Sequence, residues 1–195
     1  MHKIKQIILA IIIMVLAPLF IQQGANIFAQ DISDNLSLYI TLQQMQSSTL
    51  SDLYLPSSGN SAAINQFGNS NSAYINQVSG TSSNGNLGII YQYLQNNSAS
   101  ITQTGSNNKS YIGQNGIGNQ ASTTVEGNNN KTGILQIGDN NNASQDISGD
   151  SKEYLILQMG NNNTFSQVGS NETVSGYKIY QTGSGMNLKI LNGRY

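Results

Sequence analysis

The sequence lacks most of the residues that carry chemistry. It contains no cysteine and no tryptophan, a single histidine, His2, and only 9% charged residues. Without cysteine the chain forms no disulfide and has no thiolate chemistry. A formal net charge of −1 argues against a nucleic-acid binder, because such a protein would carry a basic face.

The amino terminus has the pattern of a secretory signal peptide. Lys3 and Lys5 precede an apolar run over 7–20, and small or polar residues continue to Ala29. This order is typical of a signal peptide that is cleaved after Ala29. A retained membrane anchor is the alternative, but the run of about 14 residues is short of the ~20 that span a bilayer. We therefore expect a signal peptide over 1–29 and a secreted mature chain.

Loss of the signal peptide would also remove His2. The mature chain would then lack the usual general base, the usual zinc ligands and the most reactive nucleophile. Asp146 and Asp150 could in principle act as the two carboxylates of a glycosidase, but solvated turn residues are the simpler interpretation. A β-helix polysaccharide lyase would need greater length and clustered charges. We expect no enzyme activity, no catalytic residue, no metal, no cofactor and no small-molecule substrate.

What the sequence does contain is amide-rich repetition, with 27 Asn and 19 Gln. Such low complexity is prone to β-aggregation. A frame written N-x-A-x-I-x-Q-x-G recurs along the chain, and successive copies lie eleven residues apart from Asn86 to Lys152. Its copies begin at Asn60, Asn71, Asn86, Asn97, Asn108, Asn119, Asn130, Asn141, Lys152 and Asn161, and in worn form at Ser175 and Asn187.

The spacing within each copy is two residues, which is the period of a β-strand. One face of a short strand would therefore carry the Asn, Ala, Ile and Gln side chains, and the Gly and polar residues that follow would form a tight turn. Stacked 22-residue coils would pair as parallel strands about 4.8 Å apart, with two sheets about 10 Å apart. We predict an all-β fold, a β-solenoid of about six 22-residue strand-turn-strand coils with two facing parallel sheets, over residues 60–185.

Stacking explains why the frame repeats. Amide ladders between identical side chains satisfy buried polar groups that would otherwise cost a few kcal/mol each. No helix-like cap precedes Asn60, so the open ends should continue the ladder into another molecule as a cross-β fibre. The residues that we expect to stack in this amyloid core are Asn60, Ile64, Gln66, Asn71, Ile75, Gln77, Asn86, Ile90, Gln92, Asn97, Ile101, Gln103, Asn108, Ile112, Gln114, Asn130, Ile134, Gln136, Ile156, Gln158, Gln167, Ile179 and Gln181.

These copies resemble curlin repeats, the units of bacterial curli subunits, over roughly residues 60–185. The resemblance implies an extracellular functional amyloid, a curli pilus, that is exported across the outer membrane and serves adhesion and biofilm matrix. It also implies self-association into fibres, a second curli-like subunit and outer-membrane export or assembly factors as partners.

The chain departs from the major curli subunit at both ends. Residues 30–59 are not the Gly-rich export segment of that subunit, and we expect a flexible or partly helical leader there. The tail, 186–195, is divergent and basic, and its Lys189 and Arg194 are candidates for surface attachment. A divergent, basic last repeat resembles minor subunits, which favours a surface-tethered, nucleator-like subunit over a major one.

Two other classes of protein stay open. A monomeric secreted β-solenoid could bind a surface or a glycan through one flat face, but it would need a regular outward array such as repeated Thr pairs, and the outward positions vary. A disordered Asn-rich matrix chain would need no register, so the regular Ile spacing argues against it. The outward tyrosines could bind dyes, surfaces or sugars, although strand-favouring residues on an open sheet are the simpler interpretation; they are Tyr74, Tyr91, Tyr111 and Tyr180.

Overall fold

The computed structural model describes residues 59–79, 84–169 and 175–191, and the regular structure in these ranges is all β-strand. The predicted signal peptide, the predicted leader up to residue 58, and Arg194 lie outside the described residues. No helix in the described ranges is long and apolar enough to cross a membrane. The strands are β1 Gly59–Phe67, β2 Ser72–Ser79, β3 Asn84–Tyr93, β4 Ser98–Gly105, β5 Lys109–Asn115, β6 Gln120–Glu126, β7 Lys131–Ile137, β8 Asn142–Ser148, β9 Glu153–Met159, β10 Thr164–Val168, β11 Gly176–Thr182 and β12 Asn187–Leu191.

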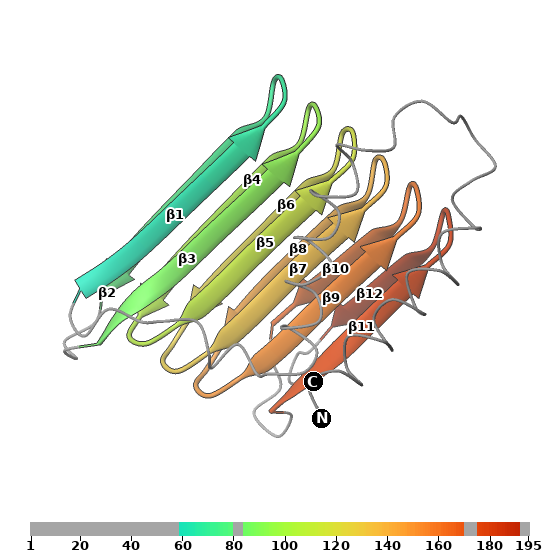
Figure 1. Cartoon of the computed structure of the whole chain (residues 1–195). Coiled ribbons are helices and arrows are strands. Elements are labelled where there is room, and N and C mark those ends of the chain that lie inside the picture. The colour runs from blue at the N-terminus through green and yellow to red at the C-terminus, as the bar shows by residue number, and fades with distance from the viewer. Residues whose placement is uncertain (1–58, 80–83, 170–174, 192–195) are drawn as a thin grey trace, which may run out of the picture. The chain divides into compact units, whose positions relative to one another are not determined.

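The strands form two parallel sheets of six strands each (Figure 1). Sheet A has the order β1-β3-β5-β7-β9-β11, and sheet B has the order β12-β10-β8-β6-β4-β2. Each odd strand with the even strand after it makes one coil, and successive coils stack in register. The predicted β-solenoid of about six coils with two facing parallel sheets is confirmed.

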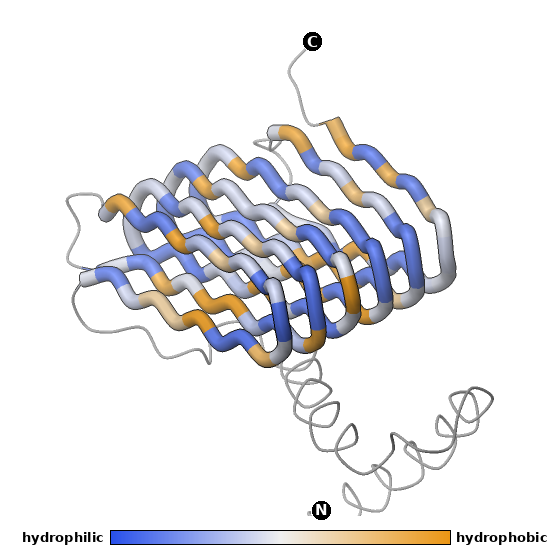
Figure 2. The backbone as a smooth tube through the Cα atoms, turned by 90° about the horizontal axis from the view of Figure 1, so that it is seen from above, coloured by the Kyte–Doolittle hydropathy of each residue, from blue (hydrophilic) through white to orange (hydrophobic). Residues whose placement is uncertain are grey.

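The interior strands of sheet B alternate between buried and accessible side chains, as the two-residue period predicts, whereas β5, β7 and β9 of sheet A are buried along almost their whole length. In β6, for example, Ala121, Thr123 and Val125 are buried, and the residues between them are exposed or half-buried. The buried positions of both sheets face one another and make a thin core. Hydrophilic residues gather where the chain turns from one sheet to the other, and these turns stack in a column (Figure 2).

The turns repeat because two of their residues adopt positive φ. In the turn after β6 these are Gly127 (φ 134°) and Asn129 (φ 59°), residue types that tolerate this conformation. A Cβ added at Gly127 would lie 2.1 Å from the carbonyl oxygen of Gly149 in the next coil. Glycine is therefore required there by the close approach of stacked turns as well as by φ. Leu94 (φ 74°) occupies the equivalent position in the turn after β3 without being glycine.

The last strand lies inside the segment that the sequence assigned to a divergent tail. Residues of β12 pair with β10 in parallel, with Leu188 beside Phe165 and Lys189 beside Ser166. Met186 occupies the Asn position of this last copy, because its backbone N–H donates to Asn163 Oδ1. The frame start predicted at Asn187 is thus one residue too late.

Candidate self-assembly site

The core of the stack is built from rows of identical residues that run across the coils. In sheet A the register places one isoleucine of each coil above the next, in a single row formed by Ile64, Ile90, Ile112, Ile134, Ile156 and Ile179. The interior members are completely buried, whereas Ile64 at the β1 edge is 47% exposed. Sheet B continues the pattern only partly, because its row reads Ile75, Ile101, Thr123, Gln145, Gln167 and Ile190.

A glutamine ladder runs the full height of sheet A. The Nε2 of each Gln donates to Oε1 of the Gln in the next coil, at 2.7 Å from Gln66 to Gln92 and 2.8 Å at each later step. The ladder consists of Gln66, Gln92, Gln114, Gln136, Gln158 and Gln181. All its bonds point the same way, with the donor on the amino-terminal side.

The second hydrogen of each interior Nε2 also has a partner. Gln114 Nε2 donates to the carbonyl oxygen of Ser98 in the facing sheet, at 3.0 Å, and Gln136 Nε2 donates likewise to that of Gln120, at 2.8 Å. The same bond recurs at Gln92, Gln158 and Gln181. A buried amide without partners would cost about 1–3 kcal/mol, so the ladder makes glutamine tolerable in the core. It also ties the two sheets together.

Asparagine ladders run along both turn columns in the opposite sense. Asn108 donates from its backbone N and from Nδ2 to Asn86 Oδ1, at 3.0 Å each, and its Nδ2 also donates to Gly127 O at 2.7 Å. Sheet B repeats this from Asn97 to Asn163. Here the donor lies on the carboxy-terminal side, so the stack has a chemical direction.

Sequence reasoning placed most of these residues at core positions, with two differences. The structure adds Asn119, Asn141 and Asn163, which are completely buried ladder residues; the first two were visible as frame starts. The frame start at Asn161 is wrong by two residues, because Asn163 makes the bonds to Asn141 Oδ1.

That shift moves Gln167 out of the glutamine row. It pairs with Gln145, in the row that holds isoleucine in earlier coils. Gln145 Nε2 and Gln167 Oε1 are buried without a hydrogen-bond partner among the described residues. Among the described residues of sheet B, stacked glutamines are therefore hydrogen-bonded only once, from Gln77 Nε2 to Gln103 Oε1, at 2.8 Å. Val125 and Ile147 fill the glutamine row beyond it.

The two ends of the stack differ in what they present. At the amino-terminal end, β1 and β2 are the edge strands; the copy in β1 has the full frame, the copy in β2 has Ser79 at the Gly position, and no described residue donates to Gln66 Oε1. At the carboxy-terminal end, β11 and β12 are the edge strands. Besides its bond to Thr164 O, Gln181 Nε2 has a 3.5 Å contact with Met186 O in place of the bond that interior glutamines make to the next amide. The asparagine ladders stop before this end. Lys152 follows Asn130 in the row of sheet A, and Met186 follows Asn163 in the row of sheet B.

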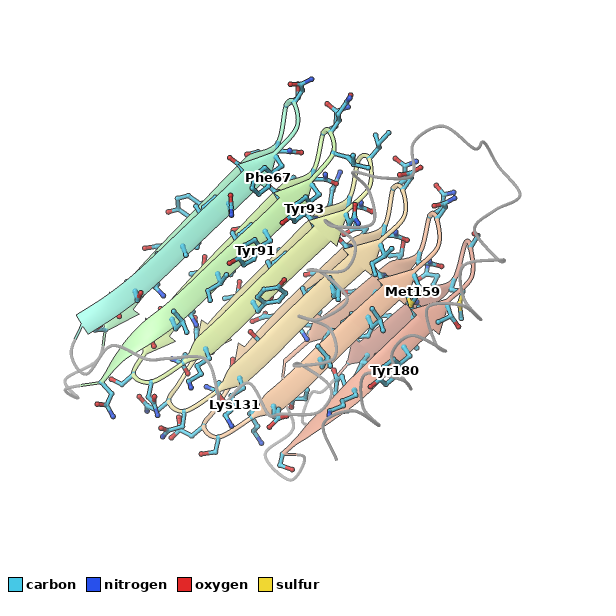
Figure 3. All side chains as sticks on the ribbon, viewed as in Figure 1. Phe67, Tyr91, Tyr93, Lys131, Met159 and Tyr180 are labelled. Atoms are coloured by element: carbon cyan, nitrogen blue, oxygen red, sulfur yellow. The ribbon has the colours of Figure 1, made fainter. Side chains whose placement is uncertain are left out.

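The outer face of sheet A carries several aromatic residues (Figure 3). Phe67 stacks on Tyr93 with ring centroids 5.0 Å apart, and Tyr91 lies 6.0 Å from Tyr111. Burial raises the pKa of Tyr111 well above its ordinary value of 10.0, and nearby Tyr91 and Tyr93 raise it further. In the core, burial also raises the pKa of Tyr154. The Tyr154 hydroxyl has no hydrogen-bond partner among the described residues.

The described residues contain no group of three or more His, Cys, Asp or Glu side chains that could hold a metal ion. What the residues do share is repetition in register, with rows that stop abruptly at both ends.

Comparison with known proteins gives one match. Residues 95–124 match the family model described as the curlin associated repeat, so the chain contains a curlin repeat. This segment spans the turn into β4, the strands β4 and β5, and most of β6. Searches of the curated proteins and of the solved structures find no significant match. The repeat points to a curli-type structural subunit.

Proposed function

We propose that this chain, which carries a curlin repeat, is a structural subunit of an extracellular amyloid fibre and that its solenoids join end to end. The observation that carries the proposal is that the core rows stop, unfinished, at both ends of the stack. Parallel strands require the β11–β12 end of one copy to meet the β1–β2 end of the next. The role is structural and not catalytic.

The rows would continue across this joint. Ile179 would lie over Ile64, Gln181 over Gln66 and Ile190 over Ile75 of the next copy, as the same rows do inside the chain. Gln181 Nε2 would donate to the free Gln66 Oε1 and extend the glutamine ladder in its existing direction. The joint would also pair the unpaired backbone groups of four edge strands.

Charge favours this pairing of unlike ends. The strands β1 and β2 carry no charged residue, whereas β11 and β12 carry Lys178 and Lys189. Two carboxy-terminal ends would bring these cations together, while an uncharged end does not repel them. In the proposed joint Lys189 would lie beside Tyr74, where the ammonium could contact the ring face.

The finer roles follow from the resemblance and belong to the same proposal. The fibre would serve adhesion and biofilm matrix at the cell surface after signal-peptide cleavage near Ala29. Its partners would be a second curli-like subunit and the outer-membrane export or assembly factors. The basic end, with Lys189 and Arg194, supports a minor, surface-tethered subunit that nucleates polymerisation.

Release from denaturant tests the fibre. Purified chain transferred into buffer should show rising thioflavin fluorescence, and the sediment should diffract near 4.8 and 10 Å. A β-rich chain that stays monomeric would overturn the proposal and favour a soluble solenoid that binds through a flat face.

Seeding tests the nucleator role separately. Substoichiometric amounts of this chain should shorten the lag phase of a partner subunit. An unchanged lag, with fibres of this chain still forming alone, would contradict nucleation and leave a major-subunit role.

A further inference from the structure

The outer face of sheet B carries a regular array of short hydroxyl side chains. Register places Ser100, Ser122, Ser144 and Ser166 in one row across four coils, with Tyr74 before them in the first coil and Lys189 after them in the last. Thr102 and Thr124 are neighbours in the next row. The sequence hid this regularity, because odd and even copies alternate along the chain and only the even copies form sheet B.

The part of this face between Tyr74 and Lys189, on β4, β6, β8 and β10, is flat and accessible. The four serines are half-buried by their neighbours, and the residues near the strand ends are exposed. Hydroxyls within a row lie about 4.8 Å apart, and rows two residues apart lie about 6.6 Å apart. No large side chain lies between Ser98 of β4 and Ser148 of β8 except Gln120 and Glu126 at the strand ends.

We propose that this face is where a second copy of the chain, in a neighbouring fibre, packs sheet against sheet. The inference rests on the proposed fibre. Short, identical side chains in register on parallel strands interdigitate into dry interfaces, and serine and threonine leave room for a close approach. The charged residues on the described part of this face are Glu126, Asp146 and Lys189, so two such faces carry little net charge.

The area explains why fibres would pair and monomers would not. The four strands β4, β6, β8 and β10, spaced by about 4.8 Å and with seven residues of about 3.3 Å each, give one copy a patch of roughly 440 Å². Two copies would bury about 900 Å², below the roughly 1,200–2,000 Å² in stable complexes. The contact is also polar, so a single pair is weak. A fibre repeats it in every subunit, and the many contacts act together.

The outer face of sheet A has no comparable array of short side chains. Aromatic residues of different sizes interrupt its rows (Figure 3).

Ser144→Lys in the full chain tests the inference. A long cation at the centre of the four-strand patch, unlike Lys189 beyond its edge, should keep two sheets from closing to about 10 Å. Along a fibre the lysines would recur only every ~29 Å, beyond the Debye length of about 8 Å at physiological salt, so fibre formation should be unchanged. Ile117→Lys is the matched control, because Ile117 is exposed in a turn and lies off the face. Ser144→Thr should keep the contact.

Thioflavin kinetics report on fibres, and electron microscopy reports on pairing. We expect the same kinetics in all four proteins and at least a fivefold (~1 kcal/mol) smaller ratio of paired to single filaments in Ser144→Lys alone. Pairing of Ser144→Lys at the wild-type level overturns the inference. Single wild-type filaments that bind an insoluble β-glucan through Ser144 also overturn it and assign the face to a glycan. Absence of fibres from the wild type removes the proposed function itself, and thioflavin distinguishes that failure.

Discussion

At the scale of single residues, the core depends on amides whose hydrogens and oxygen are all used. Gln114 accepts from Gln92, donates to Gln136 and donates to the Ser98 carbonyl. Replacing the Gln114 amide changes all three bonds at once, whereas replacing a surface glutamine changes none of them.

Gln114→Glu should therefore destabilise the stack strongly at neutral pH. The carboxylate loses both donors and is buried against two oxygens, a cost of about 3 kcal/mol or more. Burial should raise the pKa of the new carboxyl above the ~4.3 of an exposed glutamate. The charge penalty is thus absent below the unfolded-state pKa of ~4.3 and grows as pH rises toward the raised folded-state pKa, while the loss of one donor bond persists at every pH.

Thioflavin kinetics at pH 4 and pH 7 measure this effect. The control is Gln120→Glu, since Gln120 is exposed on sheet B. Equal delay in both variants at pH 7 would show that the ladder bonds contribute little.

The buried tyrosines predict loss of stability in alkali. Burial raises the pKa of Tyr111 and of Tyr154 above 10.0, so above pH ~10 the unfolded chain binds fewer protons than the folded chain. Stability then falls as pH rises. Tyr154→Phe should reduce this fall, and at pH 8 it should be neutral or stabilising by about 1 kcal/mol because it removes an unpartnered buried hydroxyl.

Denaturant midpoints of freshly desalted monomer at pH 8 and pH 11 measure both effects. Tyr180→Phe is the control, because Tyr180 is 50% exposed and should change neither midpoint. A lower midpoint for Tyr154→Phe at pH 8 would contradict the absence of a partner for its hydroxyl.

At the scale of elements, strands follow from the period of two and turns from residues that accept positive φ. The spacing of Ile64 and Gln66 already predicts that both face the core. The position of Gln167 could not be predicted, because it depends on the backbone and side-chain bonds that fix Asn163. The serine row was hidden for a different reason, since it requires knowledge of which copies share a sheet.

Leu94 is the element-scale exception, since it takes positive φ without glycine. Leu94→Gly should stabilise the monomer by roughly 0.5–1 kcal/mol, because a non-glycine residue there is strained by about 1–2 kcal/mol and the unfolded-state entropy of glycine offsets part of the gain. Ile117→Gly is the control, because Ile117 lies in the turn after β5, in the next coil, and does not adopt positive φ. This variant relieves no strain and adds unfolded-state entropy, so it should destabilise the monomer. The urea midpoints of the two variants measure these effects. A shift of both midpoints in the same direction would contradict strain at Leu94.

At the scale of the whole molecule, the stack has a chemical direction. The glutamine ladder donates toward the carboxy-terminal end, and the asparagine ladders donate toward the amino-terminal end. The glutamine ladder can cross the proposed joint, but the asparagine ladder of sheet B stops at Asn163, with Met186 in the next position. A joint between molecules should therefore be weaker than a step between coils. The sequence alone shows the repeat but not this difference between ends.

Met186→Asn should strengthen the joint. Its Oδ1 would accept from Asn71 of the next copy, and one added hydrogen bond of about 1 kcal/mol corresponds to roughly a fivefold change in equilibrium. We expect a lower concentration of residual monomer at the end of assembly by about that factor. Met186→Leu, which adds no amide, should leave the concentration unchanged. Equal values in the two variants would show that the joint does not follow the asparagine row.

The most direct test of end-to-end joining uses the absence of cysteine. Asn65 and Tyr180 lie in one outward row of sheet A, at opposite ends of the stack. In the proposed joint the two positions meet at about 4.8 Å, within the range that a disulfide spans. Fibres of the Asn65→Cys, Tyr180→Cys variant, oxidised and dissolved without reductant, should give a ladder of covalent multimers. The Ile117→Cys, Tyr180→Cys variant, with one thiol in an exposed turn off both sheet faces, should stay monomeric. Monomers from both variants, or dimers without longer chains from the first, would contradict the joint.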